Sequence, residues 1–440
     1  MKEDKLFQIA EEIIKLSDMT TDVIIISNNY LFQRFANSFI HQPTYEENYL
    51  IGIRIRDGNK ISLVWTNSTN KENLSYLLKK AKSFLIEDEH ITPLKKKEIP
   101  SFNFAYDEFD LNADEGARII EEVIKIGKKY KAFGNFYKGF QHILMLSSDG
   151  FEGYNKTSIC HITVNYINGT SAWSQYSSYK ISDILENYKL IAEDCLYKAN
   201  LNKNLSEIEP GQYTVIFSSL ALYDILEIIN YFAFSSKNYY DNLSPFRDKL
   251  NQKIFSEKIN LYEKPLNIFP IGFDFEGNIK QNFPVIENGI LRNIALNNKY
   301  SNLLNLQNNA CANIPFSEHA IFSHLYLKGG DKSIEKIIEE TEKGILVNRV
   351  WYVNLVEMQS LTLTGMTRDG LYFIENGKIK YGLKNMRFTQ SFIEAFNNIE
   401  EISNSERIIV NSNFYEFFPR GFILPDVKIS KFHFISKTEF

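Results

Sequence analysis

One short stretch of the chain, from Leu361 to Ile379, constrains the fold more than any other part of the sequence. It holds two turn dipeptides, Asp369-Gly370 and Asn376-Gly377, on either side of the apolar run 371–374. Asn-Gly and Asp-Gly readily adopt the positive φ angles that tight hairpin turns require. The stretch therefore predicts a β-meander with a turn at each dipeptide.

The Asn-Gly turn has a counterpart earlier in the chain. Glu287-Asn288-Gly289 matches Glu375-Asn376-Gly377, and an isoleucine precedes each triplet. An Asn-Gly pair between apolar runs is a strong hairpin signal, so two of them predict a strand-rich C-terminal half. We expect the turn residues themselves to lie at the surface and to carry no chemistry.

The bulk composition indicates the class of protein. A chain of 440 residues is too long for one ordinary hydrophobic core, and 44% hydrophobic with 23% charged residues is typical of a soluble globular protein. No apolar run approaches the ~18–20 residues that cross a bilayer, and the N-terminus lacks the apolar region of a signal peptide. We therefore expect a cytoplasmic protein without membrane contact.

Charge and cysteine content exclude two further classes. A net charge of -5 gives no electrostatic reason to bind nucleic acid, whose recognition normally needs a basic surface. Cys160, Cys195 and Cys311 are odd in number and widely spaced, which predicts neither a disulfide framework nor a CxxC metal site. We interpret them as small buried residues.

The first half reads as helices and strands that end in a polar segment. Apolar periodicity predicts helices over 6–16, 74–85 and 182–199, and Thr69 or Asn70 is expected to cap the second of them. A further helix is expected to begin at a capping-box-like pair, Asn112 and Glu115. Strands are expected at 23–26, 142–145 and 159–166, with a hairpin at Asp57-Gly58 and a turn at Asp149-Gly150. The polar stretch 200–210 ends in Pro-Gly and predicts a boundary between domains 1–205 and 206–440.

The second half is expected to contain more strand than helix. Its pattern predicts a strand at 213–217, a helix over 219–234 capped by Ser218 or Ser219, strands within 283–294 and 345–356, and a helix over 332–342. Helices and strands do not alternate as in βαβ units, so the fold class is α+β. We expect an N-terminal helix and sheet domain followed by a strand-rich C-terminal domain with hairpins and a few helices.

Two pairs of residues raise the question of a metal or a nucleophile. His319 and His324 lie five positions apart, which places the rings on opposite faces of a strand or ~140° apart on a helix. We favour surface or interface histidines over a metal site. Cys160 and His161 are adjacent in an expected strand and would face opposite sides, which disfavours a thiol and its base.

A third pair, Asp274 and Glu276, consists of carboxylates two positions apart before Gly277. In a strand both would face one side and could act as general acid and base, although a polar strand edge is the simpler interpretation. The chain has no Gly-x-Gly-x-x-Gly, Walker or Gly-x-Ser-x-Gly pattern, so nucleotide-binding and serine-hydrolase hypotheses have no local support.

In their order along the chain, several segments resemble the TldD/PmbA family of metalloprotease-related proteins, formerly called modulators of DNA gyrase. The resemblance runs nearly end to end. The segments that carry it are 34–37, 52–55, 66–67, 210–215, Asp274-Phe275-Glu276-Gly277, Ile286-Glu287-Asn288-Gly289, and Thr367-Arg368-Asp369-Gly370 through Arg387-Phe388.

Catalytic members of that family carry His-Glu-x-x-x-His on the helix after the first strand of the second half, and a cysteine ligand near the C-terminus. Here the matching positions run from Leu226 and Glu227 to Tyr231, and no cysteine follows Cys311. A catalytic transition metal needs about three side chains with lone pairs, so we expect no metal in this chain. Glu227 remains at the general-base position, but without an ion to acidify water we expect a polar helix or subunit-contact residue.

The missing histidines resemble the TldE/PmbA branch of the family. This resemblance implies a subunit without metal or other cofactor in a cytoplasmic TldD/TldE-type metalloprotease complex that degrades or processes unfolded peptides. A TldD-like partner would hold the zinc in a hetero-oligomer, and a homodimer is the other possible assembly. Two alternatives stay open: an independent hydrolase that uses Asp274, Glu276 or Glu227, and a regulatory binding protein of a topoisomerase.

Overall fold

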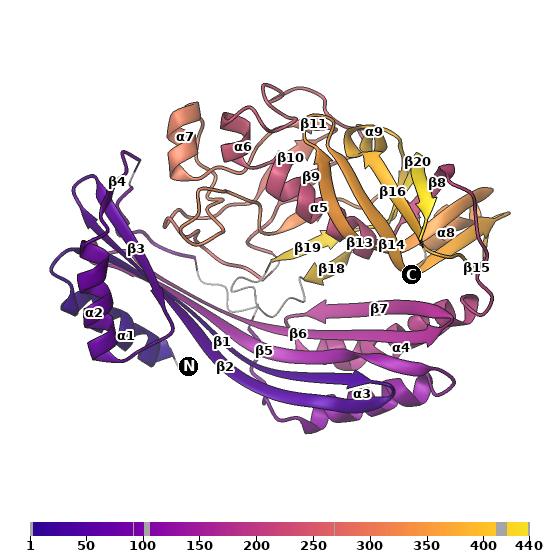
Figure 1. Ribbon diagram of the computed structural model, residues 1–440, viewed down its shortest axis with the longest axis horizontal. Helices are drawn as coiled ribbons and strands as arrows, with labels where there is room; N and C mark the ends of the chain where they lie inside the picture. The colour runs from indigo at the N-terminus through magenta and orange to yellow at the C-terminus, as the bar shows by residue number, and fades with distance from the viewer. Residues whose placement is uncertain (1–2, 91, 101–105, 268, 411–419, 439–440) are drawn as a thin grey trace.

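The computed structural model describes residues 3–90, 92–100, 106–267, 269–410 and 420–438, and its fold is α+β, as predicted. The first half forms an antiparallel sheet in the order β4-β3-β2-β1-β5-β6-β7. Its strands are β1 (Thr20–Ala36), β2 (Phe39–Asp57), β3 (Lys60–Thr66), β4 (Ile86–Glu87), β5 (Lys131–Ser147), β6 (Glu152–Asn168) and β7 (Thr170–Ser178). The long strands β1, β2, β5 and β6 curve beneath the second half (Figure 1).

Four helices cover one face of this sheet, the face turned away from the second half in Figure 1. They are α1 (Glu3–Leu16), α2 (Lys71–Lys82), α3 (Asp114–Ile126) and α4 (Ile181–Leu201). On β1, Val23 and Ile25 pack against α1 and α2, whereas Ile24 and Ile26 point to the other face. That second face is apolar too, and residues of the second half such as Phe273 cover it.

The second half contains two further sheets. One has the order β11-β10-β9-β12-β19-β18 and consists of β9 (Leu261–Glu263), β10 (Phe283–Glu287), β11 (Ile290–Leu291), β12 (Leu325–Leu327), β18 (Arg407–Val410) and β19 (Gly421–Leu424). The other sheet has the order β13-β8-β20-β16-β14-β15, and β17 also pairs with β20. Its strands are β8 (Gly211–Phe217), β13 (Lys343–Glu357), β14 (Thr362–Glu375), β15 (Lys378–Gly382), β16 (Met386–Ser391), β17 (Ile399–Ile402) and β20 (Val427–Lys437). Because β13 also pairs with β14, five of these strands form a closed ring.

The helices of the second half are short except for α5. They are α5 (Ser219–Ala233), α6 (Ser236–Tyr240), α7 (Asn298–Leu304), α8 (Ile334–Glu339) and α9 (Phe392–Asn397). The apolar side chains of α5 pack with those of both sheets in the largest core cluster of the described residues. The helix predicted over 332–342 is observed as α8 and is shorter than expected. The N–H of Thr341 donates to the carbonyl of Ile338 at the end of α8, and β13 already begins at Lys343.

Most local predictions for the first half are confirmed. Asn70 caps α2 by accepting hydrogen bonds from the backbone N–H groups of Glu72 and Asn73. The expected capping box of α3 is wrong. Asn112 accepts from the N–H of Asp114, while the Glu115 carboxylate pairs with Lys138 of β5 at 3.1 Å, so a contact to the sheet replaces the cap.

The two Asn-Gly hairpins are confirmed, and their φ angles are positive at both turn residues. Asn288 and Gly289 join β10 to β11, and Asn376 and Gly377 join β14 to β15. The latter turn rests on the end of α8, where the N–H of Gly377 donates to the carbonyl of Thr341. A short local signal sufficed here because such two-residue turns need little help from distant parts of the chain.

The turn predicted at Asp369-Gly370 is wrong. Both residues have positive φ, 56° and 127°, but β14 continues through them as one strand. Val347 of β13 pairs with Leu371 and Arg349 pairs with Arg368, so β14 holds one extra residue at this point. The dipeptide forms a β-bulge, in which positive φ accommodates an inserted residue instead of reversing the chain.

We predict that Gly377→Ala destabilises the protein more than Gly58→Ala. Both glycines have positive φ, which costs an alanine roughly 1–2 kcal/mol. A Cβ at Gly377 would lie 2.4 Å from the carbonyl oxygen of Glu339, whereas one at Gly58 would have no atom within 4 Å. The overlap should lower the free energy of unfolding by a further ~1–3 kcal/mol. Urea unfolding followed by circular dichroism measures the difference, and equal midpoints for the two variants would contradict it.

Candidate functional site

Helix α5 carries the positions that the sequence marks as a degenerate metal motif, and hydrogen bonds fix where the helix begins. Ser218 caps it by accepting from the N–H of Ala221, and the Ser218 hydroxyl donates to the carbonyl of Asn348 at 2.6 Å. The N–H of Ser219 donates to the carboxylate of Asp426 at 2.8 Å. The N-terminus of α5 is thereby tied to the strand β13 and to the segment before β20.

The two positions where histidines would be required lie in different surroundings. Leu226 is 4% exposed and lies in the core cluster, while Tyr231 is 38% exposed and stacks on His319 with ring centroids 5.0 Å apart. Residues five apart on a helix are separated by ~140°, so the two side chains leave α5 in different directions. The interpretation of His319 as a surface or interface residue agrees with this contact.

Glu227 lies between these positions and is engaged by a cation. Its carboxylate is 3.3 Å from the guanidinium of Arg420, and both side chains are less than one-fifth exposed. An arginine keeps its proton at any physiological pH, so this contact supplies a positive charge but no reactive group. These three residues do not fit a divalent metal ion. Leu226 has no lone pair, Glu227 is bound to Arg420, and the phenol of Tyr231 is stacked on His319.

A polar cavity of about 370 Å³ lies beside α5, one turn before Glu227. Tyr223 and Asp224 of α5, Arg349 of β13, Arg368 and Asp369 of β14, and Trp173 of β7 belong to its wall. The cavity therefore lies where the edge of the first sheet meets the second half.

The bulge in β14 explains how Asp369 reaches this seam. Its carboxylate accepts hydrogen bonds from Arg349 at 2.9 Å and from the hydroxyl of Ser171 in the first sheet. The guanidinium of Arg349 also lies over the ring of Trp173, 4.2 Å from its centroid. Arg368 lies in the same way over Trp351 of β13. The segment 367–370, expected to be a surface turn, thus joins the two halves.

Asp224 is the chemically unusual group in this cavity. Burial raises the pKa of its carboxyl from the ordinary 3.8 to about 6; the charge of Asp369 adds to the rise, and Arg349 opposes it. Among the residues that the structure describes, Asp224 has no hydrogen-bond or ion-pair partner. Asp224, Arg349 and Trp173 carry no motif that would predict this cavity from the sequence. The one signal is that Asp224 precedes Glu227 by three residues and so shares its side of α5.

The carboxylate pair Asp274 and Glu276 is brought together, but not in a strand as expected. Both lie in a tight turn that ends at Gly277. Asp274 is 1% exposed and accepts hydrogen bonds from the N–H groups of Glu276, Asn278 and Ala312. The Asn278 side chain donates a fourth. Asp274 therefore organises the turn and is unavailable as an acid or base, whereas Glu276 lines a second cavity.

The other candidate residues are placed in structural contacts. Cys160, Cys195 and Cys311 are buried and free, as expected. His161 contacts the hydroxyl of Ser177. The prediction of a surface or interface residue is wrong for His324, which is fully buried beside Ser323 because its backbone N–H is bound by the buried carboxylate of Glu263. Within the described ranges, no group of three or more histidine, cysteine and acidic side chains is arranged to hold a metal ion, and no helix is long and apolar enough to cross a membrane.

Known proteins share this fold and sequence pattern. The model of the PmbA/TldA metallopeptidase C-terminal domain matches residues 210–436, so the chain belongs to this family. A metalloprotease of Methanocaldococcus jannaschii is 22% identical over 388 residues, which cover 82% of this chain and 84% of that protein.

Solved structures extend the similarity over nearly the whole chain. The crystal structure of TldE from Thermococcus kodakarensis superimposes with a TM-score of 0.83 at 17% identity and covers 98% of this chain and 99% of that one. A candidate modulator of a DNA gyrase from Thermotoga maritima gives a TM-score of 0.81 at 17% identity, with the same coverage. At this level of identity the similarity establishes the common fold.

The raised pKa of Asp224 leads to a prediction about stability and pH. Because the folded state holds the proton more tightly than the unfolded state, the Asp224 carboxyl makes folding less favourable as pH rises from about 4 to about 6. We predict that Asp224→Asn raises the free energy of unfolding at pH 8 by about 1–3 kcal/mol and changes it little at pH 4.

Urea unfolding at the two pH values measures this effect, with Asp331→Asn as the matched control on the surface. The control should change stability by less than about 0.5 kcal/mol at either pH. A gain for Asp224→Asn of equal size at both pH values would show that the carboxyl is not destabilised by its surroundings.

Proposed function

We propose that this chain is a TldE/PmbA-like subunit of a cytoplasmic TldD/TldE-type metalloprotease complex, and that it holds no catalytic metal itself. The observation that carries the proposal is the state of α5, where Leu226 is part of the core and Glu227 is paired with Arg420. Hydrolysis by a metallopeptidase needs an ion that acidifies a water next to a free general base. Neither requirement fits the residues on this helix.

In this proposal, a TldD-like partner supplies the zinc, and the two subunits act together on unfolded peptides. Family membership and the fold shared with TldE support the assignment to a peptidase-related assembly. An extended peptide can bind a strand edge through its backbone, which requires no particular sequence. The strand-rich second half offers such edges at β15 and β18, and the cavity beside α5 offers a polar surface next to β18.

The geometry speaks against two of the three carboxylates of an independent hydrolase. Asp274 is saturated with hydrogen bonds, and Glu227 is bound by a guanidinium, so neither of these two is poised to take a proton from water. Glu276, the third, lies at the other cavity and accepts from the N–H of Asn298 at 2.7 Å. A regulatory role toward a topoisomerase is suggested by the description of a structural neighbour alone.

Metal analysis of the chain alone and of the chain co-purified with a TldD-like partner tests the proposal. We predict that zinc is absent from the isolated chain, and that the complex contains about one zinc per partner subunit and hydrolyses unfolded casein. Glu227→Gln in this chain should lower the activity of the complex by no more than about twofold, whereas the same change in the partner's metal motif should abolish it.

Three outcomes would contradict the proposal. Stoichiometric zinc in the isolated chain would overturn the metal-free assignment. Casein hydrolysis by the isolated chain that is lost in Glu227→Gln would identify an independent hydrolase. Capture of gyrase subunits in place of a TldD-like protein would favour the regulatory alternative.

A further inference from the structure

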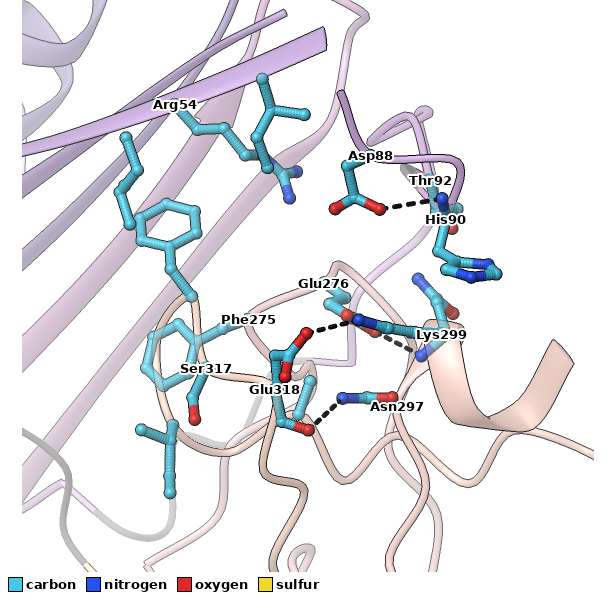
Figure 2. A pocket seen from close by; sticks show the side chains of 16 residues that line it. Arg54, Asp88, His90, Thr92, Phe275, Glu276, Asn297, Lys299, Ser317 and Glu318 are labelled. Atoms are coloured by element: carbon cyan, nitrogen blue, oxygen red, sulfur yellow. Dashed lines mark hydrogen bonds and ion pairs between the residues drawn. The ribbon is translucent and has the colours of Figure 1, made fainter. Parts of the chain in front are cut away.

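A second cavity, of about 190 Å³, lies between the two halves at the other end of the first sheet (Figure 2). Arg54 of β2 and Asp88 and His90 after β4 approach it from the first half. Glu276 and Lys299 approach it from the second half and face them across the cavity (Figure 2). Its walls therefore combine charged groups from segments that are far apart in the sequence.

Two hydrogen-bond donors at this cavity lack acceptors. The Nε of Arg54 donates to Asp22 at 2.8 Å, but its Nη2 is buried without a hydrogen-bond partner in the described part of the chain. Asn298 has the same deficit. Its Oδ1 accepts from the side chains of Asn278 and Asn308, which leaves its Nδ2 buried and without a partner in the described ranges. A buried donor without an acceptor is costly, so a ligand that offered an acceptor to both donors would be stabilised here.

The acceptors already present are engaged elsewhere. The Asp88 carboxylate accepts from the N–H of His90 at 2.9 Å, and Glu318 pairs with Lys299. Glu276 accepts from the N–H of Asn298 at 2.7 Å. None of these contacts satisfies Nη2 of Arg54 or Nδ2 of Asn298. An acceptor supplied by a ligand would complete both.

Glu276 makes the charge of the cavity depend on pH. Burial raises the pKa of its carboxyl to about 7; the charge of Asp274 adds to the rise, and Arg54 opposes it. Glu276 therefore takes up a proton at a higher pH than an ordinary glutamate does. In that form the carboxyl offers a further donor and no longer repels an anion.

Apolar side chains make up part of the remaining wall, and the volume is small. Phe275, Ile314 and Phe316 belong to this wall, and the ring centroid of Phe316 lies 5.5 Å from the guanidinium of Arg54. Sites for drug-sized ligands typically measure about 300–1,000 Å³, so this cavity suits a ligand about as large as a single amino-acid residue.

We propose that this cavity binds the carboxylate of a small amino-acid-like ligand, such as the C-terminal residue of a short peptide. Arg54 and Asn298 donate to the carboxylate, and the side with Phe275 and Phe316 accommodates an apolar side chain. This inference concerns the isolated chain, and it does not depend on a metal-bearing partner.

Three related probes test the charge of the ligand. N-Acetyl-leucine carries only the carboxylate, leucine amide carries only the amine, and N-acetyl-leucine amide carries neither. Titration of each into the purified full-length chain, followed by calorimetry or protein NMR at pH 6, should show saturable binding of N-acetyl-leucine and at least about tenfold weaker binding of the other two. Absence of N-acetyl-leucine binding, or tighter binding of leucine amide, would overturn the proposal.

The pH dependence and one isosteric variant test the role of Glu276. If the anion binds only when Glu276 is protonated, its Kd should rise about tenfold between pH 6 and pH 8, in proportion to the loss of the protonated form. Glu276→Gln keeps a neutral side chain at both pH values and should bind with nearly constant Kd. His90, Asp88 and Lys299 also line the cavity, and Glu276→Gln leaves all three unchanged. An unchanged pH dependence in Glu276→Gln would remove Glu276 from the proposal.

Arg54 is tested against a matched surface arginine. Arg54→Gln should weaken N-acetyl-leucine binding at least about tenfold, whereas Arg292→Gln, which removes a surface ion pair with Glu287, should leave the Kd within about twofold. Circular dichroism of both variants checks that they are folded. Equal Kd values for folded Arg54→Gln and the parent chain would place the ligand elsewhere and overturn the assignment.

Discussion

The sheet of the first half has two apolar faces, and its own helices can cover only one of them. Helices α1 to α4 bury the face that contains Val23 and Ile25, while Ile24 and Ile26 project from the other side. A sheet must bury each apolar face against another layer, so the second half has to pack there. This constraint produces the seam between the halves, and both polar cavities lie along it.

Each of the two cavities contains charged groups and has walls from both halves of the chain. At one end, the bulge of β14 directs Asp369 toward Ser171 and Arg349, and Asp224 of α5 lies in the same wall. At the other end, the turn built by Asp274 places Glu276 opposite Arg54. In each case burial raises the pKa of an acidic group, because the charged form loses hydration that the surroundings do not fully replace.

Helix α5 links the second half to its neighbours through its cap and its core face. Ser218 caps it, its apolar side chains lie in the main core cluster, and it belongs to the region that matches the family model. Along this helix Leu226 fills the core, and Glu227 is paired with Arg420. A core leucine and a buried ion pair each stabilise the fold only as long as both sides of the contact are kept.

Features with local signals could be read from the amino-acid sequence alone: helices with one apolar stripe, the Asn-Gly hairpins at 288–289 and 376–377, the Ser218 cap, and the lack of imidazoles at 226 and 231. Three other features emerged from long-range packing: Asp369-Gly370 forms a bulge, Asp274 and Glu276 belong to a turn with separate roles, and Asp224 lines the same cavity as Arg349. Positive φ angles and apolar periodicity act over a few residues, whereas a bulge or a cavity depends on partners far away in the chain. Such partners become neighbours only after the sheets have packed.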